Sequence, residues 1–196
     1  MGPEKIDTMP TSAKRWFDLV LVAAASPIAA LAIAILAAAV WLADGRPIFF
    51  RQARVGRGRR PFLIWKLRTM TCEPEVEARR PTRLGAWLRH RGLDELPQLF
   101  NVVSGEMSLV GPRPLTPADA DRLAAGHAGF EERFLVAPGI TGLAQVCGAR
   151  GAAPTARLDA EYARTRSAAM DLGLLLRTVW INVVGKRRGF WNRLRS

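Results

Sequence analysis

The chain is poor in the residues that build disulfide frameworks and histidine metal centres. Its 196 residues include two cysteines, Cys72 and Cys147, and two histidines, His90 and His127. The cysteines have no CxxC spacing and no histidine nearby, which argues against a disulfide framework and a structural zinc site. Two histidines are also too few for a histidine-rich metal centre. This composition is typical of a protein that faces a reducing cytosol.

Acidic residues are scarce as well. The chain has 17 Asp and Glu against 29 Lys and Arg, a net charge of +12. Such an excess favours anionic partners, whether nucleic acid, anionic lipid or phosphorylated substrates, and charge alone does not choose among them. The length is enough for one domain with a real core and an appendage.

One long run carries no charge. Residues 19–43 are apolar throughout and, at about 1.5 Å per residue, could cross a hydrocarbon core of roughly 30 Å. A signal peptide is disfavoured because the run is too long for an ordinary apolar region and no clean cleavage site follows it. A plain spanning helix is the stronger alternative.

Two features favour a bent, re-entrant helix over a spanning one. Ser26-Pro27 interrupts the run, and proline removes a helical hydrogen bond and introduces a kink. Both flanks are basic, and positive charge beside a membrane segment prefers the cytoplasm; these residues are Lys14, Arg15, Arg46, Arg51, Arg54 and Arg57. We therefore expect both ends on one face, with the Ser26 hydroxyl helping to satisfy the backbone at the bend. Asp18 is expected to pair with a nearby lysine or arginine.

The remaining residues predict a mainly helical α+β domain. Two strand-like runs, Pro47–Arg51 and Phe62–Leu67, flank a basic, glycine-rich segment and predict a β-hairpin. Residues 71–81 look like an exposed linker. Helices are expected from apolar spacing at residues 82–92, 93–103, 117–134, 158–165 and 170–184. The predicted division is a membrane-associated re-entrant helix over residues 1–45 and a cytosolic-face domain over residues 46–196, which ends in a basic interfacial tail.

Residues 93–114, LDELPQLFNVVSGEMSLVGPRP, hold the most informative pattern. They place two adjacent acids, Asp94 and Glu95, ahead of the segment Pro112-Arg113-Pro114. In a strongly basic protein this combination suggests a site for a metal-bound phosphate, because acids attract the metal while arginine holds phosphate oxygens in a planar fork. The prolines restrict the backbone that carries Arg113. The acids are also expected at a helix N-terminus, where the helix dipole stabilises negative charge.

Six segments together carry a family resemblance. They are KRWFDLVLVAAASP, PIFFRQARVG, FLIWKLRTM, TRLGAWLR, LDELPQLFNVVSGEMSLVGPRPL and APGITGLAQV, and they cover most of residues 14–150. In these segments the chain resembles the small monotopic phosphoglycosyl transferases, which are bacterial initiating sugar-phosphate transferases. Gly92 and Cys147 depart from the family pattern at positions where a small hydroxyl residue and asparagine are common.

The resemblance implies a reaction. A sugar-1-phosphate passes from a nucleotide diphosphate sugar, usually a UDP-sugar, to polyprenol phosphate, with Mg²⁺ as cofactor. Asp94 is implied as the nucleophile that forms a covalent phosphosugar-enzyme, and Glu95 as its partner that positions magnesium or handles a proton. Arg113, framed by Pro112 and Pro114, is implied as a contact to the diphosphate. Further phosphate contacts are expected at Lys66, Arg68 and Arg89.

The same resemblance implies a monotopic protein on the cytoplasmic face of the bacterial inner membrane, in contact with membrane lipids and active in exopolysaccharide or other glycoconjugate synthesis. A homodimer is left open. So are the roles of Asp159 and Asp171, for which a helix cap or a structural ion pair is the alternative to a functional role.

Two other functions remain as rivals. The first is a membrane-tethered basic module that binds anionic lipid or nucleic acid without catalysis. It does not account for Asp94-Glu95, which would repel phosphate without a metal. Nucleic acid is not an expected partner, because the basic hairpin tip lacks aromatic residues for stacking. The second is a transferase that passes the lipid phosphate directly to the nucleotide sugar with no covalent step.

Overall fold

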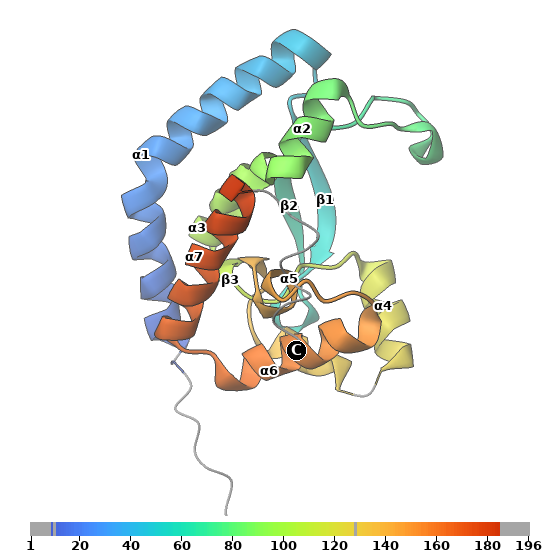
Figure 1. The fold of residues 1–196 in the computed structure, drawn as a ribbon. Helices are drawn as coiled ribbons and strands as arrows, with labels where there is room; N and C mark the ends of the chain where they lie inside the picture. The colour runs from blue at the N-terminus through green and yellow to red at the C-terminus, as the bar shows by residue number, and fades with distance from the viewer. Residues whose placement is uncertain (1–8, 10, 128, 185–196) are drawn as a thin grey trace, which may run out of the picture.

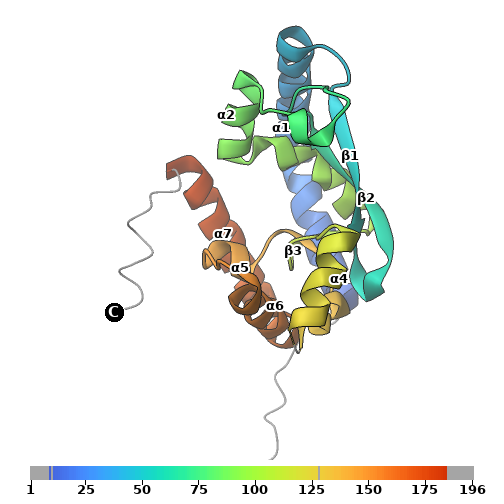
Figure 2. The same ribbon diagram turned by 90° about the vertical axis from the view of Figure 1, so that its right-hand side faces the viewer.

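The computed structural model describes residues 9, 11–127 and 129–184. The predicted basic interfacial tail, residues 186–196, lies outside these residues. Within them the chain is an α+β protein in which helices dominate, as the sequence predicts. Figures 1 and 2 show a long helix along one edge, a β-hairpin along another, and shorter helices between and below them.

The long helix, α1 (Thr11–Asp44), contains the whole apolar run. In the part of the chain that the structure describes, it is the one helix long and apolar enough to cross a membrane. It bends along its length (Figure 1) but is not interrupted, so Ser26 and Pro27 lie in a bent helix rather than at a break. Pro27 lacks an N–H, which leaves the Ala23 carbonyl without its helical donor. The Ser26 hydroxyl donates to that carbonyl at 2.8 Å, as predicted.

The predicted hairpin is confirmed. Strands β1 (Phe49–Val55) and β2 (Pro61–Leu67) pair antiparallel, with Phe49 opposite Leu67 and Val55 opposite Pro61. The first strand continues to Val55, beyond the predicted end at Arg51. A turn of 3-10 helix, η1 (Arg57–Arg59), forms the basic tip.

The helices depart from prediction where glycine or proline interrupts an apolar pattern. Residues 93–103 form a 3-10 helix and then a short α-helix, because Pro97 lies inside the first. Residues 117–134 also divide in two, around Gly129 with a φ of 78°. The elements are α2 (Arg83–Arg91), η3 (Leu93–Gln98), α3 (Leu99–Ser104), α4 (Pro117–Gly126), η4 (Phe130–Leu135), α5 (Leu143–Val146), α6 (Ala152–Thr165) and α7 (Ala168–Val184). The linker contains one 3-10 turn, η2 (Val76–Ala78).

A second, small sheet joins two distant segments. Strand β3 (Ser108–Val110) pairs in parallel with β4 (Gly139–Thr141). The backbones approach so closely that a Cβ on Gly139 would lie 2.0 Å from the Gly111 nitrogen, so glycine is required there. This pairing holds the segment before Pro112 against the segment that follows Pro138.

Both halves of α1 pack on the same body. Val22 is buried with Phe62, Ile64, Val102 and Met107. Val40, nearer the other end, is buried with Leu67 and Leu88. The apolar helix therefore contributes to the core that residues 46–196 form.

A buried polar network fixes the first turns of α1. Lys14 lies 2.6 Å from Asp18 and 2.8 Å from Asp171 on α7. Ser108 donates to Asp18 at 2.7 Å, and Tyr162 donates to Asp171 at 2.8 Å. The predicted partner of Asp18 is confirmed as Lys14, and Asp171 lies in a structural ion pair. Burial raises the pKa of Asp171, an effect that Lys14 opposes.

We expect Lys14→Met to destabilise the fold by about 3–5 kcal/mol, because it leaves two buried aspartates without their cation. Chemical denaturation in detergent micelles measures the loss. The matched control is Arg122→Gln, which breaks an exposed pair with Asp119 and should cost less than about 1 kcal/mol. Equal stability of the two variants would contradict a structural role for the network.

Candidate functional site

The two adjacent acids lie in η3, directly after the left-handed glycine that follows α2. Helix α2 ends at Arg91 and is followed by Gly92, whose φ of 69° is a left-handed conformation that glycine adopts without strain. η3 then begins at Leu93 and packs against strand β2. The glycine thus turns the chain so that Asp94 and Glu95 meet the hairpin.

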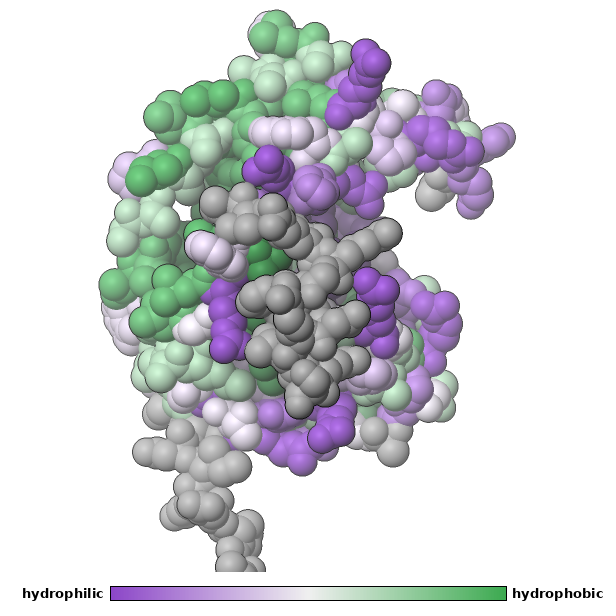
Figure 3. Space-filling model, in the orientation of Figure 1, coloured by the Kyte–Doolittle hydropathy of each residue, from purple (hydrophilic) through white to green (hydrophobic). Residues whose placement is uncertain are grey.

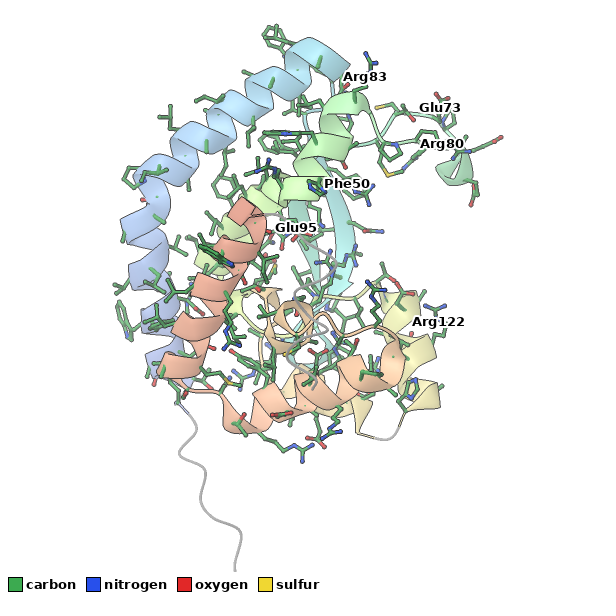
Figure 4. All side chains as sticks on the ribbon, in the orientation of Figure 1. Phe50, Glu73, Arg80, Arg83, Glu95 and Arg122 are labelled. Atoms are coloured by element: carbon green, nitrogen blue, oxygen red, sulfur yellow. The ribbon has the colours of Figure 1, made fainter. Side chains whose placement is uncertain are left out.

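Glu95 is the centre of a small charged cluster. Its Oε1 accepts a hydrogen bond from Lys66 Nζ at 2.6 Å and another from Arg113 Nη2 at 3.0 Å. Figure 4 shows Glu95 in the interior of the fold, whereas the other labelled charged residues lie at its periphery. The structure therefore brings together three predicted residues from β2, η3 and the segment after β3.

Asp94 lies beside this cluster with different surroundings. It is 7% exposed, and among the described residues it forms no ion pair. Burial and the neighbouring charge of Glu95 raise the pKa of Asp94. Burial acts in the same direction on Glu95, but Arg113 and Lys66 outweigh it and lower the pKa of Glu95. The pKa values of the two acids are therefore shifted in opposite directions, a pattern typical of acid pairs with separate chemical roles.

The Pro112-Arg113-Pro114 segment is clamped through its backbone. The carbonyl of Pro112 accepts from the Gly139 N–H at 2.9 Å. The Arg113 carbonyl accepts from Arg133 at 2.7 Å, and the Pro114 carbonyl from Arg54 at 3.1 Å. The two prolines are buried while the Arg113 side chain is 52% exposed. The Arg113 guanidinium is thus half exposed to solvent, while the backbone that carries it is fixed by hydrogen bonds.

The other predicted phosphate contacts are not all in this cluster. Arg89 is exposed on α2 and lies close enough to Asp94 to lower the pKa of that carboxyl. Arg68 is buried elsewhere and donates to the carbonyls of Asp44, Gly45 and Arg46, where α1 ends. The structure thus gives Arg68 a helix-capping contact and places it outside the site.

Arg54 and Gln98 also belong to the cluster, although neither was predicted as a site residue. Both line a small cavity with Lys66, Glu95 and Arg113. Gln98 is 2% exposed and its amide nitrogen has no partner within the described structure. Strand alternation could have found Arg54, because it lies opposite Phe62 and therefore on the same hairpin face as Lys66. No comparable signal marks Gln98.

The two acids are compatible with a magnesium ion whose remaining ligands would be phosphate and water. Within residues 9–184 as described, no group of three or more His, Cys, Asp or Glu side chains could hold a metal by itself. Mg²⁺ is commonly bound by one or two carboxylates together with substrate phosphates and water. Asp94 and Glu95 are adjacent carboxylates beside three cations, so they match that arrangement.

Comparison with known proteins matches most of the chain. A family model described as bacterial sugar transferase matches residues 9–185. A UDP-glucose:undecaprenyl-phosphate glucose-1-phosphate transferase of Caulobacter vibrioides is 42% identical over 181 residues, which cover 85% of this chain and 68% of that protein. A protein of the same name from Escherichia coli is 35% identical and is covered over 40% of its length.

The alignment with a third relative covers most of both proteins. An uncharacterised sugar transferase of Bacillus subtilis is 38% identical over 174 residues, 85% of this chain and 85% of that protein. The similarity therefore extends over the site and over α1, and it includes relatives of different lengths.

Proposed function

Because the chain belongs to the bacterial sugar transferase family, we propose that it transfers a sugar-1-phosphate from a UDP-sugar to undecaprenyl phosphate. The observation that carries the proposal is the cluster of Lys66, Glu95 and Arg113 beside the buried Asp94. Two relatives are named for this reaction with UDP-glucose. The site supplies what the reaction requires, namely a carboxylate nucleophile and cations for a diphosphate.

The proposed reaction proceeds in two displacements. The Asp94 carboxylate attacks the β-phosphorus of the UDP-sugar, an oxygen–phosphorus bond forms, and the bond to the bridging oxygen breaks. UMP leaves with that electron pair. The phosphate oxygen of the lipid then attacks the same phosphorus, the bond to Asp94 breaks, and the product is a lipid-linked diphosphate sugar. Atoms and charge balance in both steps without a further reactant.

The other residues hold charge and orientation. Arg113 and Lys66 contact the diphosphate oxygens and stabilise the negative charge that develops on the leaving UMP. Glu95 keeps both cations in place before the substrate arrives, as its two hydrogen bonds indicate. Arg89 adds positive charge on the side of Asp94. A bound magnesium ion, held by Asp94 and Glu95, would neutralise charge on the diphosphate.

Magnesium dependence follows from this charge balance. We expect EDTA to stop turnover and added Mg²⁺ to restore it, because the two acids would otherwise repel the diphosphate of the donor. UMP release measures the effect. A matched sample that receives EDTA already saturated with magnesium controls for effects of the chelator. Full activity after rigorous chelation would rule out the metal.

The exposed surface supports membrane association. Large apolar side chains are exposed on α1, α3 and α7, and Figure 3 shows the apolar colour concentrated along α1. They are Trp16, Val20, Ile28, Leu31, Ile35, Trp41, Leu42, Phe100, Val103, Leu172, Leu176, Val179 and Trp180. An apolar surface of this kind marks a membrane or partner contact. We propose that it rests in the cytoplasmic leaflet of the inner membrane and that α1 is re-entrant.

A panel of UDP-sugars assayed with undecaprenyl phosphate tests the function and identifies the sugar. UMP release that depends on both substrates supports the transferase. Retention on anionic vesicles without turnover of any donor would favour the non-catalytic membrane module. Release of one UMP per enzyme before lipid is added separates the covalent route from direct transfer.

A further inference from the structure

Arg133 occupies an unusual position for an arginine. It lies on η4, is 3% exposed, and has its guanidinium carbon 4.9 Å from the centre of the Phe130 ring. One of its nitrogens, Nη2, does two things. It lies 3.1 Å from Asp159 on α6, and it donates to the carbonyl of Arg113 at 2.7 Å. A buried chain of contacts therefore runs from α6 through η4 to the backbone of the Pro-Arg-Pro segment.

This arrangement is a poor source of stability. Burial lowers the pKa of Arg133 and raises the pKa of Asp159 to about 6, because desolvation disfavours both charged forms more than their mutual attraction favours them. Replacing a buried ion pair by apolar residues is often neutral for stability, whereas removing one partner is costly. The pair does, however, fix one carbonyl in space, and that carbonyl belongs to the residue whose side chain contacts Glu95.

We propose that Arg133, held by Asp159, is a positioning residue for Arg113. It fixes the backbone from which the half-exposed Arg113 side chain reaches the donor diphosphate. A side chain on a fixed backbone has fewer conformations to lose when it binds, so affinity for the donor rises. The inference rests on the role given to Arg113 in the proposed function. It also gives Asp159 a role: its ion pair with Arg133 holds the backbone of Arg113 in place, although Asp159 itself does not contact the substrate.

The informative variant replaces both charges with apolar residues, Arg133→Met together with Asp159→Val. This double variant leaves no buried charge unpaired, so it should fold. Because the hydrogen bond to the Arg113 carbonyl is lost, we expect KM for the UDP-sugar to rise about tenfold, a typical coupling between contacting residues, with kcat little changed. The Kd for UDP in the presence of Mg²⁺, measured by calorimetry, should rise by a similar factor and does not depend on turnover.

Two comparisons separate positioning from general packing. Arg164→Gln breaks the exposed 2.9 Å pair with Glu132, which joins the same two elements without reaching Arg113. It should leave KM unchanged. Arg133→Lys keeps a charge for Asp159 and a donor for the Arg113 carbonyl, so it should recover part of the affinity.

A double-mutant cycle gives the decisive result. In an Arg113→Ala background the positioned guanidinium is absent, so the Arg133→Met, Asp159→Val pair should no longer change the Kd for UDP. If the two effects add instead, or if Arg164→Gln weakens binding equally, Arg133 acts on the fold and the inference is wrong. If the wild type binds UDP but turns over no donor, the proposed function is wrong and the positioning role stands. If the double variant is active and its Kd for UDP is unchanged, the positioning role is wrong and the proposed function stands.

The pH dependence offers a further check. On η4, Glu131 is paired with Arg59 and Glu132 with Arg164. Among the described charged residues, Arg133 is therefore the one that influences the pKa of Asp159. Protonation of Asp159 as the pH falls through about 6 should release Arg133 and weaken UDP binding in the wild type. The double variant should lack this component. An identical pH profile for both proteins would contradict the proposed coupling.

Discussion

Asp94→Asn is expected to abolish turnover while the protein stays folded and membrane-bound. The amide oxygen is a far weaker nucleophile toward phosphorus than the carboxylate, so we expect a loss of about a thousandfold or more in kcat. The substitution is nearly isosteric, and Asp94 forms no ion pair among the described residues that its loss would break. UMP release, with circular dichroism as the check of folding, measures the effect.

The same variant tests the covalent step. Wild-type protein incubated with a UDP-sugar alone should gain the mass of a sugar phosphate, and the Asn variant should not. Asp121→Asn is a suitable control, because it removes an exposed acid on α4 whose partner Arg59 keeps Glu131. The control should remain active and form the adduct. Robust turnover by Asp94→Asn would remove Asp94 from the role of nucleophile.

The second large effect concerns the path of α1 through the membrane. The domain touches the helix near both ends, through Lys14 with Asp171 and through Val40 with Leu67 and Leu88. A spanning placement would have to carry the Lys14 network across the bilayer, away from the side on which the rest of the domain lies. We therefore expect both ends of the wild-type helix on the cytoplasmic side.

Cysteine labelling in intact cells measures this topology. Cysteines placed at the exposed positions Ser12 and Arg60, in a background without Cys72 and Cys147, should resist an impermeant thiol reagent until the cells are opened. Replacing Ser26 with alanine and Pro27 with leucine should straighten the helix and expose position 12 to the outside in part of the population. Labelling of position 12 from outside with the unaltered helix would show that α1 spans the membrane.

The features that could be predicted are those whose residues lie close together in the sequence. The hairpin follows from short apolar runs around a glycine-rich turn, and the Lys14–Asp18 pair follows from residues four apart on one helix. The family resemblance named Lys66 and Glu95 as site residues but did not predict the contact between them, since the two residues lie on different elements. Spacing alone does not reveal such a contact.

Other features depend on long-range packing and left no local signal. Arg68 follows Lys66 by two positions, but β2 ends at Leu67, so Arg68 turns to the carbonyls at the end of α1 instead of joining the site. Arg133 stands 20 residues from Arg113, within the 3-10 segment FEERFL, whose mixture of charged and apolar residues gives no local sign of the contact. The parallel pairing of β3 with β4, which brings these segments together, involves strands too short to recognise by alternation.

Helix α1 is an integral part of the fold and not a separable membrane anchor. Val22 and Val40 pack between side chains of residues 46–196, and the last carbonyl of α1, that of Asp44, accepts a hydrogen bond from Arg68. A shortened protein that starts after Asp44, made to obtain a soluble enzyme, would open Val102, Leu67 and Leu88 to water and leave Asp171 without Lys14. For the same reason the fold fixes the position of Asp94 and Glu95 relative to α1, and the proposed lipid substrate would have to reach them by lateral diffusion.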